Sequence, residues 1–450
     1  MKNDIRQMTE GNIAGSLVTF ALPVMATNLF QQLYNTVDVA VVGRYAGTEA
    51  LAAVGSAGQL TAFLIYFFIG LSIGAGIVIS HSIGSRDWEK VNIQVHTALA
   101  LAVTAGIALT VIGVWAAPLL LGLLNIPETV MTYAVPYIRI YFLGMLPMML
   151  FNMGSSILRA AGDSRTGLYC LAAGGVVNVI LDFLFVAGFS RGVRGAALAT
   201  AAAQCVSAVL VLAKLTVSGA QYRLIPRRIH LNREECMKMI RVGVPAGLQS
   251  VLVSLSNVIV QSRVNLFGLE TMAGFAAYLK LEGFLYMPIE AFGLAVSSFV
   301  GQNYGAGKRD RVEKGTRITL ILSVTVTVVL GGVLLYFGRE MIGIFDSSRE
   351  VADHGMQIMQ ILIPFYSLYA VNQTLTGTLR GMGNSAAPML ISLFTMCGLR
   401  VVYVIVMLRT ASDPRTIYVS YPLTWIVTTA ALIICYRHTK KKKWSTFICS

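Results

Sequence analysis

Apolar blocks of roughly 20 residues or more, separated by short polar breaks, run along the chain and limit what it can fold into. That length matches the hydrocarbon core of a bilayer, where every backbone N–H must be paired within the protein. The blocks are therefore predicted to be transmembrane helices. Charged residues make up only 12% of the chain, too few to cover the surface of a water-soluble fold of 450 residues.

Twelve helices are predicted, at residues 15–42, 50–80, 94–124, 131–157, 167–189, 195–217, 239–262, 271–303, 318–338, 354–378, 386–408 and 417–436. With the N-terminus inside, the inner segments hold about three times as many Lys and Arg as the outer loops. This predicts a cytoplasmic (inner) membrane protein with both termini in the cytoplasm. The same distribution explains the net charge of +14 without nucleic acid. The basic run at 440–443 is interpreted as a topology anchor against anionic lipid.

The chain repeats itself at one offset of 221 residues, since residues 158–164 (LRAAGDS) match residues 379–385 (LRGMGNS). Gly47 and Gly268, like Gly84 and Gly305, fit the same offset. Each copy holds six predicted helices, an even number, so the two copies are parallel repeats around a central cavity. The predicted parts are an N-terminal lobe at 1–217, a cytoplasmic basic linker at 218–237 and a C-terminal lobe at 238–450.

Acidic residues inside predicted helices are costly in hydrocarbon and therefore mark functional positions. Asp38 ends a polar stripe on the first helix, where Gln31, Tyr34 and Asn35 share its face. On the fifth helix Asn178 and Asp182 are neighbours one turn apart, and Thr200 lies on the sixth at a similar depth. The sequence predicts a cation-coupling site at Asp38, Asn178, Asp182 and Thr200.

The second repeat lacks this cluster, because the offset places Ile259, Leu399, Tyr403 and Tyr421 at the corresponding positions. Ion coupling is therefore predicted to reside in the N-terminal half. Two neighbouring carboxylates are suited to binding a proton as one coupled unit. Structural capping or pairing of the acids, and interhelical hydrogen bonding by Asn178 and Thr200, remain open alternatives.

Two further acids, Glu282 and Glu290, lie on the eighth predicted helix with Lys280. At least one of them is expected to face the cavity and attract cations. The alternative is a structural pair with Arg400 or Arg139 on another helix. A tentative substrate cavity combines these positions with the stripe on the first helix: Gln31, Tyr34, Asn35, Glu282, Tyr286, Met287 and Glu290.

Catalytic and metal-binding patterns are missing from the sequence. The six cysteines form no Cys-x-x-Cys pair, and the five histidines show no ligand spacing; His81 and His96 are expected to be solvated. No phosphate-binding Gly-x-x-x-x-Gly-Lys motif occurs. We therefore expect neither an enzyme nor a metal site.

Several motifs resemble the multidrug and toxic compound extrusion (MATE) family: residues 35–38 (NTVD) with Val42 and Gly43, residues 300–307 (VGQNYGAG), and the paired Leu-Arg-x-x-Gly turns. The resemblance covers nearly the whole chain. Within the family, the chain is similar to the prokaryotic branch related to the DNA-damage-inducible protein F, which implies a bacterial or archaeal membrane. In that branch a proton- or sodium-responsive network falls on the positions of Asp38, Asn178, Asp182 and Thr200. The other prokaryotic branch has essential acids on helices seven and ten, which both lack Asp and Glu here.

The resemblance implies a V-shaped, two-lobed transporter of twelve helices that works by alternating access. It implies export of amphipathic organic cations, such as drugs or toxic metabolites, in exchange for inward H⁺ or Na⁺. We expect a monomer with no cofactor besides the coupling ion. A flippase for a lipid-linked precursor or a polysaccharide, from the same superfamily, is the runner-up, although four acids against three bases within the helices favour cationic cargo.

Overall fold

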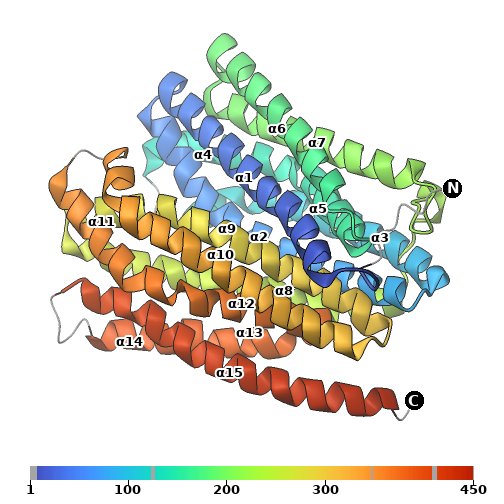
Figure 1. The fold of residues 1–450 in the computed structure, drawn as a ribbon. Coiled ribbons are helices and arrows are strands. Elements are labelled where there is room, and N and C mark those ends of the chain that lie inside the picture. Colours follow the sequence, from blue (N-terminus) through green and yellow to red (C-terminus); the bar gives the residue numbers. More distant parts are fainter. Residues whose placement is uncertain (1–7, 123–126, 346–347, 408–412, 449–450) are drawn as a thin grey trace. The chain divides into compact units, whose positions relative to one another are not determined.

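The computed structural model describes residues 8–122, 127–345, 348–407 and 413–448, which form helices and no strands (Figure 1). In the first half the helices are α1 (Ile13–Tyr45), α2 (Thr48–Gly84), α3 (Trp88–Gly122), α4 (Glu128–Leu143), α5 (Met145–Ala160), α6 (Arg165–Asp182) and α7 (Gly192–Val217). A π-helical turn, η1 (Phe183–Gly188), continues α6.

The second half begins with the 3₁₀ turn η2 (Pro226–Arg228) in the linker. Its helices are α8 (Arg233–Val264), α9 (Leu269–Gly305), α10 (Arg309–Gly343), α11 (Arg349–Leu362), α12 (Tyr366–Gly381), α13 (Ala386–Ser392), α14 (Arg400–Met407) and α15 (Arg415–Ile448). Short 3₁₀ turns η3 (Asn265–Phe267) and η4 (Ile363–Phe365) follow α8 and α11, and the π-helix η5 (Leu393–Leu399) joins α13 to α14.

Each of the twelve predicted ranges overlaps a helix; residues 123–124 and 408, at the ends of two ranges, lie outside the described residues. Among the described residues, ten helices are long and apolar enough to cross a membrane. The pair α4 and α5, bent by 44°, adds an eleventh span. The segment from α11 to α12 is not among these spans, and a proline, Pro364, interrupts it. The all-helical membrane fold is therefore confirmed, whereas the count of twelve spans stays a prediction.

Two compact units make up the molecule, and they exchange the first turns of two helices. The N-terminal unit comprises Leu22–Val244, and the C-terminal unit comprises Met8–Ala21 and Pro245–Ser450. The beginning of α1 thus belongs to the C-terminal unit, and the beginning of α8 belongs to the N-terminal unit. No composition shift in the sequence announces this exchange.

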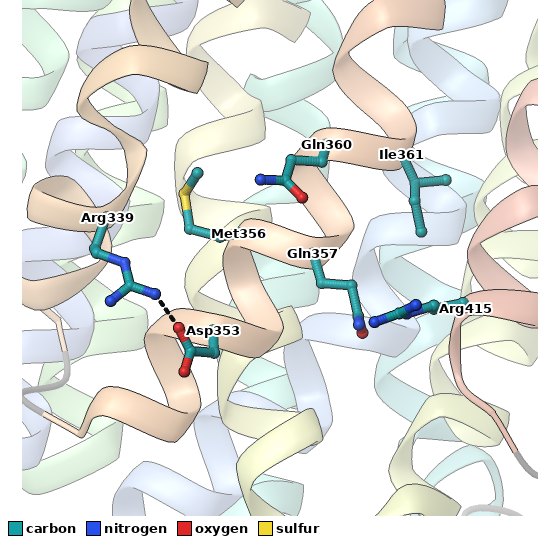
Figure 2. Close-up of a pocket in the computed structure, with 7 residues that line it drawn as sticks. All are labelled: Arg339, Asp353, Met356, Gln357, Gln360, Ile361 and Arg415. Carbon is teal, nitrogen blue, oxygen red and sulfur yellow. Dashed lines mark hydrogen bonds and ion pairs between the residues drawn. The ribbon is translucent and has the colours of Figure 1, made fainter.

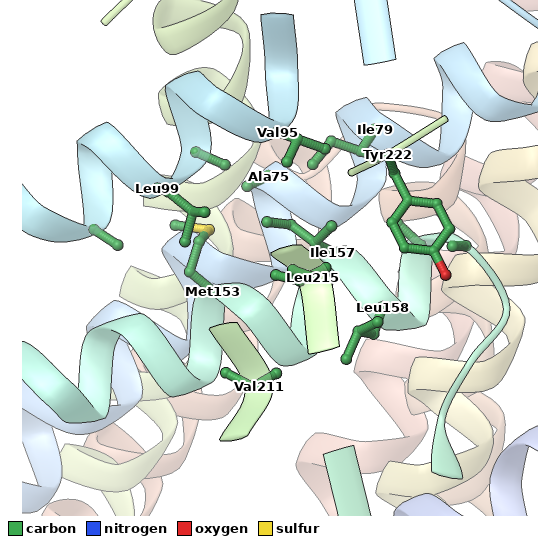
Figure 3. Packing of buried hydrophobic residues seen from close by; sticks show 14 of the residues in the cluster. Ala75, Ile79, Val95, Leu99, Met153, Ile157, Leu158, Val211, Leu215 and Tyr222 are labelled. Carbon is green, nitrogen blue, oxygen red and sulfur yellow. The ribbon is translucent and has the colours of Figure 1, made fainter. Parts of the chain in front are cut away.

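The core of the N-terminal unit lies between α2, α3, α5 and α7 (Figure 3). Ile79, Val95, Ile157 and Val211 meet there and are almost inaccessible to solvent. Glycine permits a close helix approach in this unit, because a Cβ atom on Gly74 of α2 would collide with the backbone of α8 at Gly243.

The C-terminal unit has a separate core, built mainly by α9, α11, α12 and α15. Aromatic side chains dominate it, and the Tyr366 ring lies 4.9 Å from that of Trp425, edge to face. Gly377 of α12 packs against the backbone of Gly293 on α9 so closely that a Cβ atom would collide with it. Each unit therefore has its own tightly packed interior.

His96, which we expected to be solvated, holds the linker at residues 218–237 to α3 of the N-terminal unit. His96 is 1% exposed, and its Nε2 accepts a hydrogen bond of 3.0 Å from the backbone N–H of Ile225. Its Nδ1 lies 2.7 Å from the carbonyl oxygen of Asn92, which fixes the neutral tautomer with the proton on Nδ1. The prediction of a solvated His96 is wrong, because the ring satisfies a backbone donor of the linker.

Candidate functional site

Asp38 of α1 and Asp182 of α6 lie together inside the N-terminal unit. Their carboxyl groups interact with each other electrostatically, and their exposed fractions are 9% and 0%. Within the described residues, no donor reaches either carboxylate oxygen of Asp182 or Oδ1 of Asp38. A buried ionised carboxylate without a donor is costly, which distinguishes this pair from acids that accept hydrogen bonds.

Asp182 is the last residue of α6, where the helix widens into η1. Such π-helical turns are frequent at functional positions. One turn earlier, Asn178 is completely buried, and neither its carbonyl oxygen nor its amide nitrogen has a partner among the described residues. Asn178 therefore presents an oxygen ligand and a donor beside Asp182.

Thr200 lies on α7, which packs along α6 (Figure 1). Gly174 faces Ser207, and Gly195 faces Phe185 of η1, so the register between these contacts places Thr200 opposite the stretch that carries Asn178 and Asp182. The Thr200 hydroxyl donates to the carbonyl oxygen of Ala196 at 3.1 Å. Its oxygen is therefore oriented as an acceptor.

The polar stripe of α1 divides along its length. The Tyr34 ring lies against α6 at Gly175, and the side chains of Gln31 and Gln204 lie beside its hydroxyl. Asn35, in contrast, is exposed. Only part of the stripe therefore faces the interior of the N-terminal unit.

Two tyrosines of α4 complete the surroundings of the acids and were missed by the sequence argument. Tyr137 interacts electrostatically with both Asp38 and Asp182, and Tyr141 does so with Asp38. Their rings stack with centroids 6.0 Å apart. Their spacing of four residues on a predicted helix was the available signal, since it places both on one face.

In the C-terminal unit, Glu282 of α9 is engaged by hydroxyl groups. Tyr366 of α12 donates a hydrogen bond to its carboxylate, and the hydroxyl oxygen of Tyr278 lies 3.1 Å from that of Tyr366. Arg400 acts on Glu282 electrostatically. Of the two bases proposed as its partner, the structure thus brings Arg400 into its surroundings.

Arg400 is 1% exposed, and its guanidinium is held on several sides. It donates to Thr424 Oγ1 at 2.9 Å and to Asn257 Oδ1 at 3.1 Å. It also lies 4.3 Å from the ring centroid of Tyr421, a cation–π arrangement. All these partners are neutral, and Glu282 is an acid on which Arg400 acts electrostatically.

Glu290 repeats this arrangement two turns further along α9. It accepts hydrogen bonds from Gln373 and, at 3.4 Å, from the Tyr369 hydroxyl, and Arg380 acts on it electrostatically. The Tyr286 ring stacks on Tyr369 with centroids 5.7 Å apart. Both acids of the C-terminal unit therefore have hydrogen-bond donors and an arginine nearby.

The remaining predicted residues of α9 differ in exposure: Lys280 is exposed, whereas Met287 is half-buried. In the described part of the chain, no group of three or more His, Cys, Asp or Glu side chains could hold a metal ion. In the basic run at residues 440–443, Lys440 forms an ion pair of 2.7 Å with Glu313 of α10. The side chain of Lys443 lies outside the described residues. The proposed role of residues 440–443 as a lipid anchor stays a prediction.

A polar pocket of about 450 Å³ lies elsewhere in the C-terminal unit (Figure 2). Residues of α11, with Arg339 of α10 and Arg415 of α15, line it: Asp353, Met356, Gln357, Gln360 and Ile361. Arg339 forms an ion pair with Asp353, and both side chains are about half exposed, so the pair contributes little stability. None of the predicted site residues lines this pocket.

The long apolar helices and the twofold repeat define an integral membrane protein of the polytopic transporter class. The MatE family model matches residues 23–184 and again residues 245–406, one stretch in each repeat. The chain therefore belongs to the MatE family, the multidrug and toxic compound extrusion family that its motifs resemble.

Curated relatives and solved structures agree with this assignment. The chain is 28% identical over 439 residues to the probable multidrug resistance protein YoeA of Bacillus subtilis (strain 168), covering 96% of this chain and 95% of that protein. It is 27% identical to the probable multidrug resistance protein YpnP of the same organism, with 98% of each chain covered. An outward-facing multidrug resistance MATE transporter shares the fold with a TM-score of 0.91, at 21% identity and with 98% and 99% of the two chains covered.

Proposed function

We propose that this protein is a secondary antiporter that exports amphipathic organic cations in exchange for inward H⁺ or Na⁺. The facing carboxyl groups of Asp38 and Asp182, which lack donors among the described residues, carry this proposal. Two buried carboxylates side by side repel each other, so the pair is stable only with a cation or proton bound. One charge crossing 100 mV supplies about 2.3 kcal/mol, which is enough to drive export without ATP.

The surrounding groups support exchange of a small cation. Asn178 and Thr200 each offer an oxygen near Asp182, and oxygen is the ligand that hard cations prefer. A proton shared by Asp38 and Asp182 would need no further ligand. Asn178 and Thr200 are therefore proposed as the groups that differ in importance between Na⁺ and H⁺ coupling, with Tyr137 as a polar neighbour of both acids.

The substrate-binding groups predicted from the sequence, on α1 and on α9, stay a proposal. Gln31, Tyr34 and Asn35 lie on α1, and Glu282, Tyr286, Met287 and Glu290 lie on α9. Aromatic rings and carboxylates are the groups that bind amphipathic cations. The names of the relatives YoeA and YpnP, probable multidrug resistance proteins, support this substrate class. The proposal further includes a monomer in the cytoplasmic membrane with both termini inside.

A flippase for a lipid-linked precursor or polysaccharide would need excess positive charge to hold a phosphate. In the C-terminal unit, the buried Arg400 and the half-buried Arg380 are instead accompanied by Glu282 and Glu290. This balance favours cationic over anionic cargo.

The test is ethidium efflux from energised proteoliposomes, with the pH gradient and the sodium gradient collapsed separately. Antiport predicts that collapse of one specific gradient stops efflux, and that the Asp38→Asn variant fails in both conditions. Efflux that survives the loss of both gradients would exclude coupled antiport.

A further inference from the structure

The residues that precede α1 form a strap on the C-terminal unit, to which they belong. We define the strap as residues 8–11 and its receptor, the cradle, as Gln302, Asn303, Lys308 and Arg311. The strap is packed down, since the exposed fractions of Met8 and Thr9 are 4% and 7%. The backbone N–H of Met8 donates to Gln302 Oε1 at 2.9 Å.

The cradle binds the carbonyl oxygens of all four strap residues. Arg311 Nη2 donates to the carbonyl oxygens of Met8 and Glu10 at 3.0 and 3.2 Å, and Nη1 donates to that of Gly11 at 3.0 Å. Lys308 Nζ donates to the carbonyl oxygen of Thr9 at 2.9 Å. Hydrogen bonds from charged donors are stronger than neutral ones, so the cradle holds the strap firmly.

Arg311 is itself oriented for this task. Its Nε donates to Asn303 Oδ1 at 3.1 Å, and its guanidinium lies 5.7 Å from the ring centroid of Phe299. The Asn303 amide in turn donates to the carbonyl oxygens of Phe299 and Met8. A lysine could not reproduce this fork of donors, because an ammonium is a single point of charge.

The strap passes directly into α1 through a defined cap. Gly11 has a φ angle of +73°, a conformation that glycine adopts without strain. Asn12 Oδ1 then accepts from the backbone N–H of Gly15 at 3.2 Å, as an N-cap residue does. The orientation of the strap therefore determines where α1 begins, and α1 is the helix that carries Asp38.

The first repeat has a corresponding arrangement within the N-terminal unit. There the linker before α8 is held by α3, through His96 on Ile225 and through Thr97 Oγ1, which accepts from the backbone N–H of Asn232 at 3.3 Å. Gln94 Nε2 of α3 also donates to Glu235 Oε2 at 2.7 Å. The segment before the first helix of each repeat is thus fixed by side chains of the unit that contains it.

We infer that Arg311 is a positioning residue for transport: by holding the strap, it fixes the beginning of α1 on the C-terminal unit while the Asp38 end of α1 belongs to the N-terminal unit. Cation binding at Asp38 is thereby linked to the C-terminal unit through α1, a single helix that contains one proline, Pro23, next to the boundary between the units. This inference rests on the proposed antiport function. Residues 302–311 belong to neither the proposed coupling site nor the proposed substrate groups, and the inference gives them a role of their own.

The experiment compares Arg311→Ala and Arg311→Lys with the control Lys314→Ala, which removes one positive charge from an exposed position one turn away on α10. Hydrogen exchange of residues 8–12 in the purified full-length protein reports on the strap independently of transport. Transport is measured in proteoliposomes as a function of the coupling-cation concentration. We expect faster exchange in Arg311→Ala, an intermediate rate in Arg311→Lys, and a shift of about fivefold or more in the half-maximal cation concentration of Arg311→Ala.

The outcomes separate three cases. Unchanged exchange in Arg311→Ala overturns the cradle itself. Faster exchange with an unchanged cation dependence, even if the maximal rate falls, overturns the positioning role and leaves the strap a structural contact. Absence of any cation dependence in the wild-type protein refutes the proposed antiport instead. Lys314→Ala is expected to match the wild type in both measurements, and an equal shift in this control would also overturn the assignment to Arg311.

Discussion

The two units differ in the surroundings of the acids on their helices. In the N-terminal unit, Asp38 and Asp182 face each other, and within the described residues no donor reaches three of their four carboxylate oxygens. In the C-terminal unit, Glu282 and Glu290 accept hydrogen bonds from tyrosine or glutamine side chains, and each has an arginine in its surroundings.

This difference separates a site that must change its charge from one that need not. A carboxylate pair without donors becomes stable only when a proton or cation arrives, and it is destabilised again on release. An acid with donors and a nearby arginine is already balanced, so neutralising it brings a smaller gain. We therefore assign the proposed coupling function to the N-terminal pair, and we assign the C-terminal acids to structure and to the proposed substrate contact.

The largest expected effect is on the N-terminal pair. Asp38→Asn and Asp182→Asn are each predicted to lower cation-driven efflux about a hundredfold. In either variant only one carboxyl group of the pair remains, and it cannot exchange a cation alone. Efflux rates in proteoliposomes, normalised to the amount of inserted protein, measure this. Near-normal efflux in either variant would remove that residue from the mechanism and break the comparison.

A second test concerns the charge balance at Glu282. Arg400→Met is predicted to lower the free energy of unfolding by about 2 kcal/mol, because it removes the hydrogen bonds to Thr424 and Asn257 and leaves the half-buried Glu282 without a nearby positive charge. The double variant with Glu282→Gln should recover part of this loss, measured as thermal stability in detergent. A double variant less stable than Arg400→Met would show that the two charges do not compensate each other.

A smaller effect is expected at Glu290. Glu290→Gln keeps an oxygen that accepts from Gln373 and should change the apparent KM for ethidium by about threefold while leaving the cation dependence intact. Concentration series of ethidium at fixed cation gradients check this. A loss of transport as complete as that of Asp38→Asn would move the coupling function into the C-terminal unit.

The smallest effect is expected from the linker. His96→Ala removes the acceptor of the Ile225 N–H and should cost about 1 kcal/mol of stability without altering cation dependence. Urea or thermal unfolding of the purified protein measures the loss. A changed cation dependence in this variant would mean that the linker, too, participates in coupling.

Much of this comparison was accessible from the sequence. Asp38 and Asp182 could be brought together because a bilayer fixes helix direction and depth, so spacing along each helix becomes a position in space. The tyrosines of α4 were missed because aromatic side chains are common on membrane helices for packing reasons alone. The fold class followed from the same apolar periodicity.

Other features depend on contacts that side-chain patterns do not encode. The strap is bound through its backbone carbonyl groups, which every residue possesses, so residues 8–11 give no sign of it. The exchange of the first turns of α1 and α8 likewise leaves no mark in composition. His96 was misplaced because it adjoins a charged loop, although its partner lies in a linker far along the chain.

The most direct test is cation binding to the purified protein in detergent, in the absence of substrate. Proton uptake on acidification and binding of radioactive Na⁺ should be compared between the wild type, the variant with Asp38→Asn and Asp182→Asn, and the variant with Glu282→Gln and Glu290→Gln. The account predicts that the first double variant loses the bound cation and that the second retains it. Retention by the first and loss by the second would contradict it.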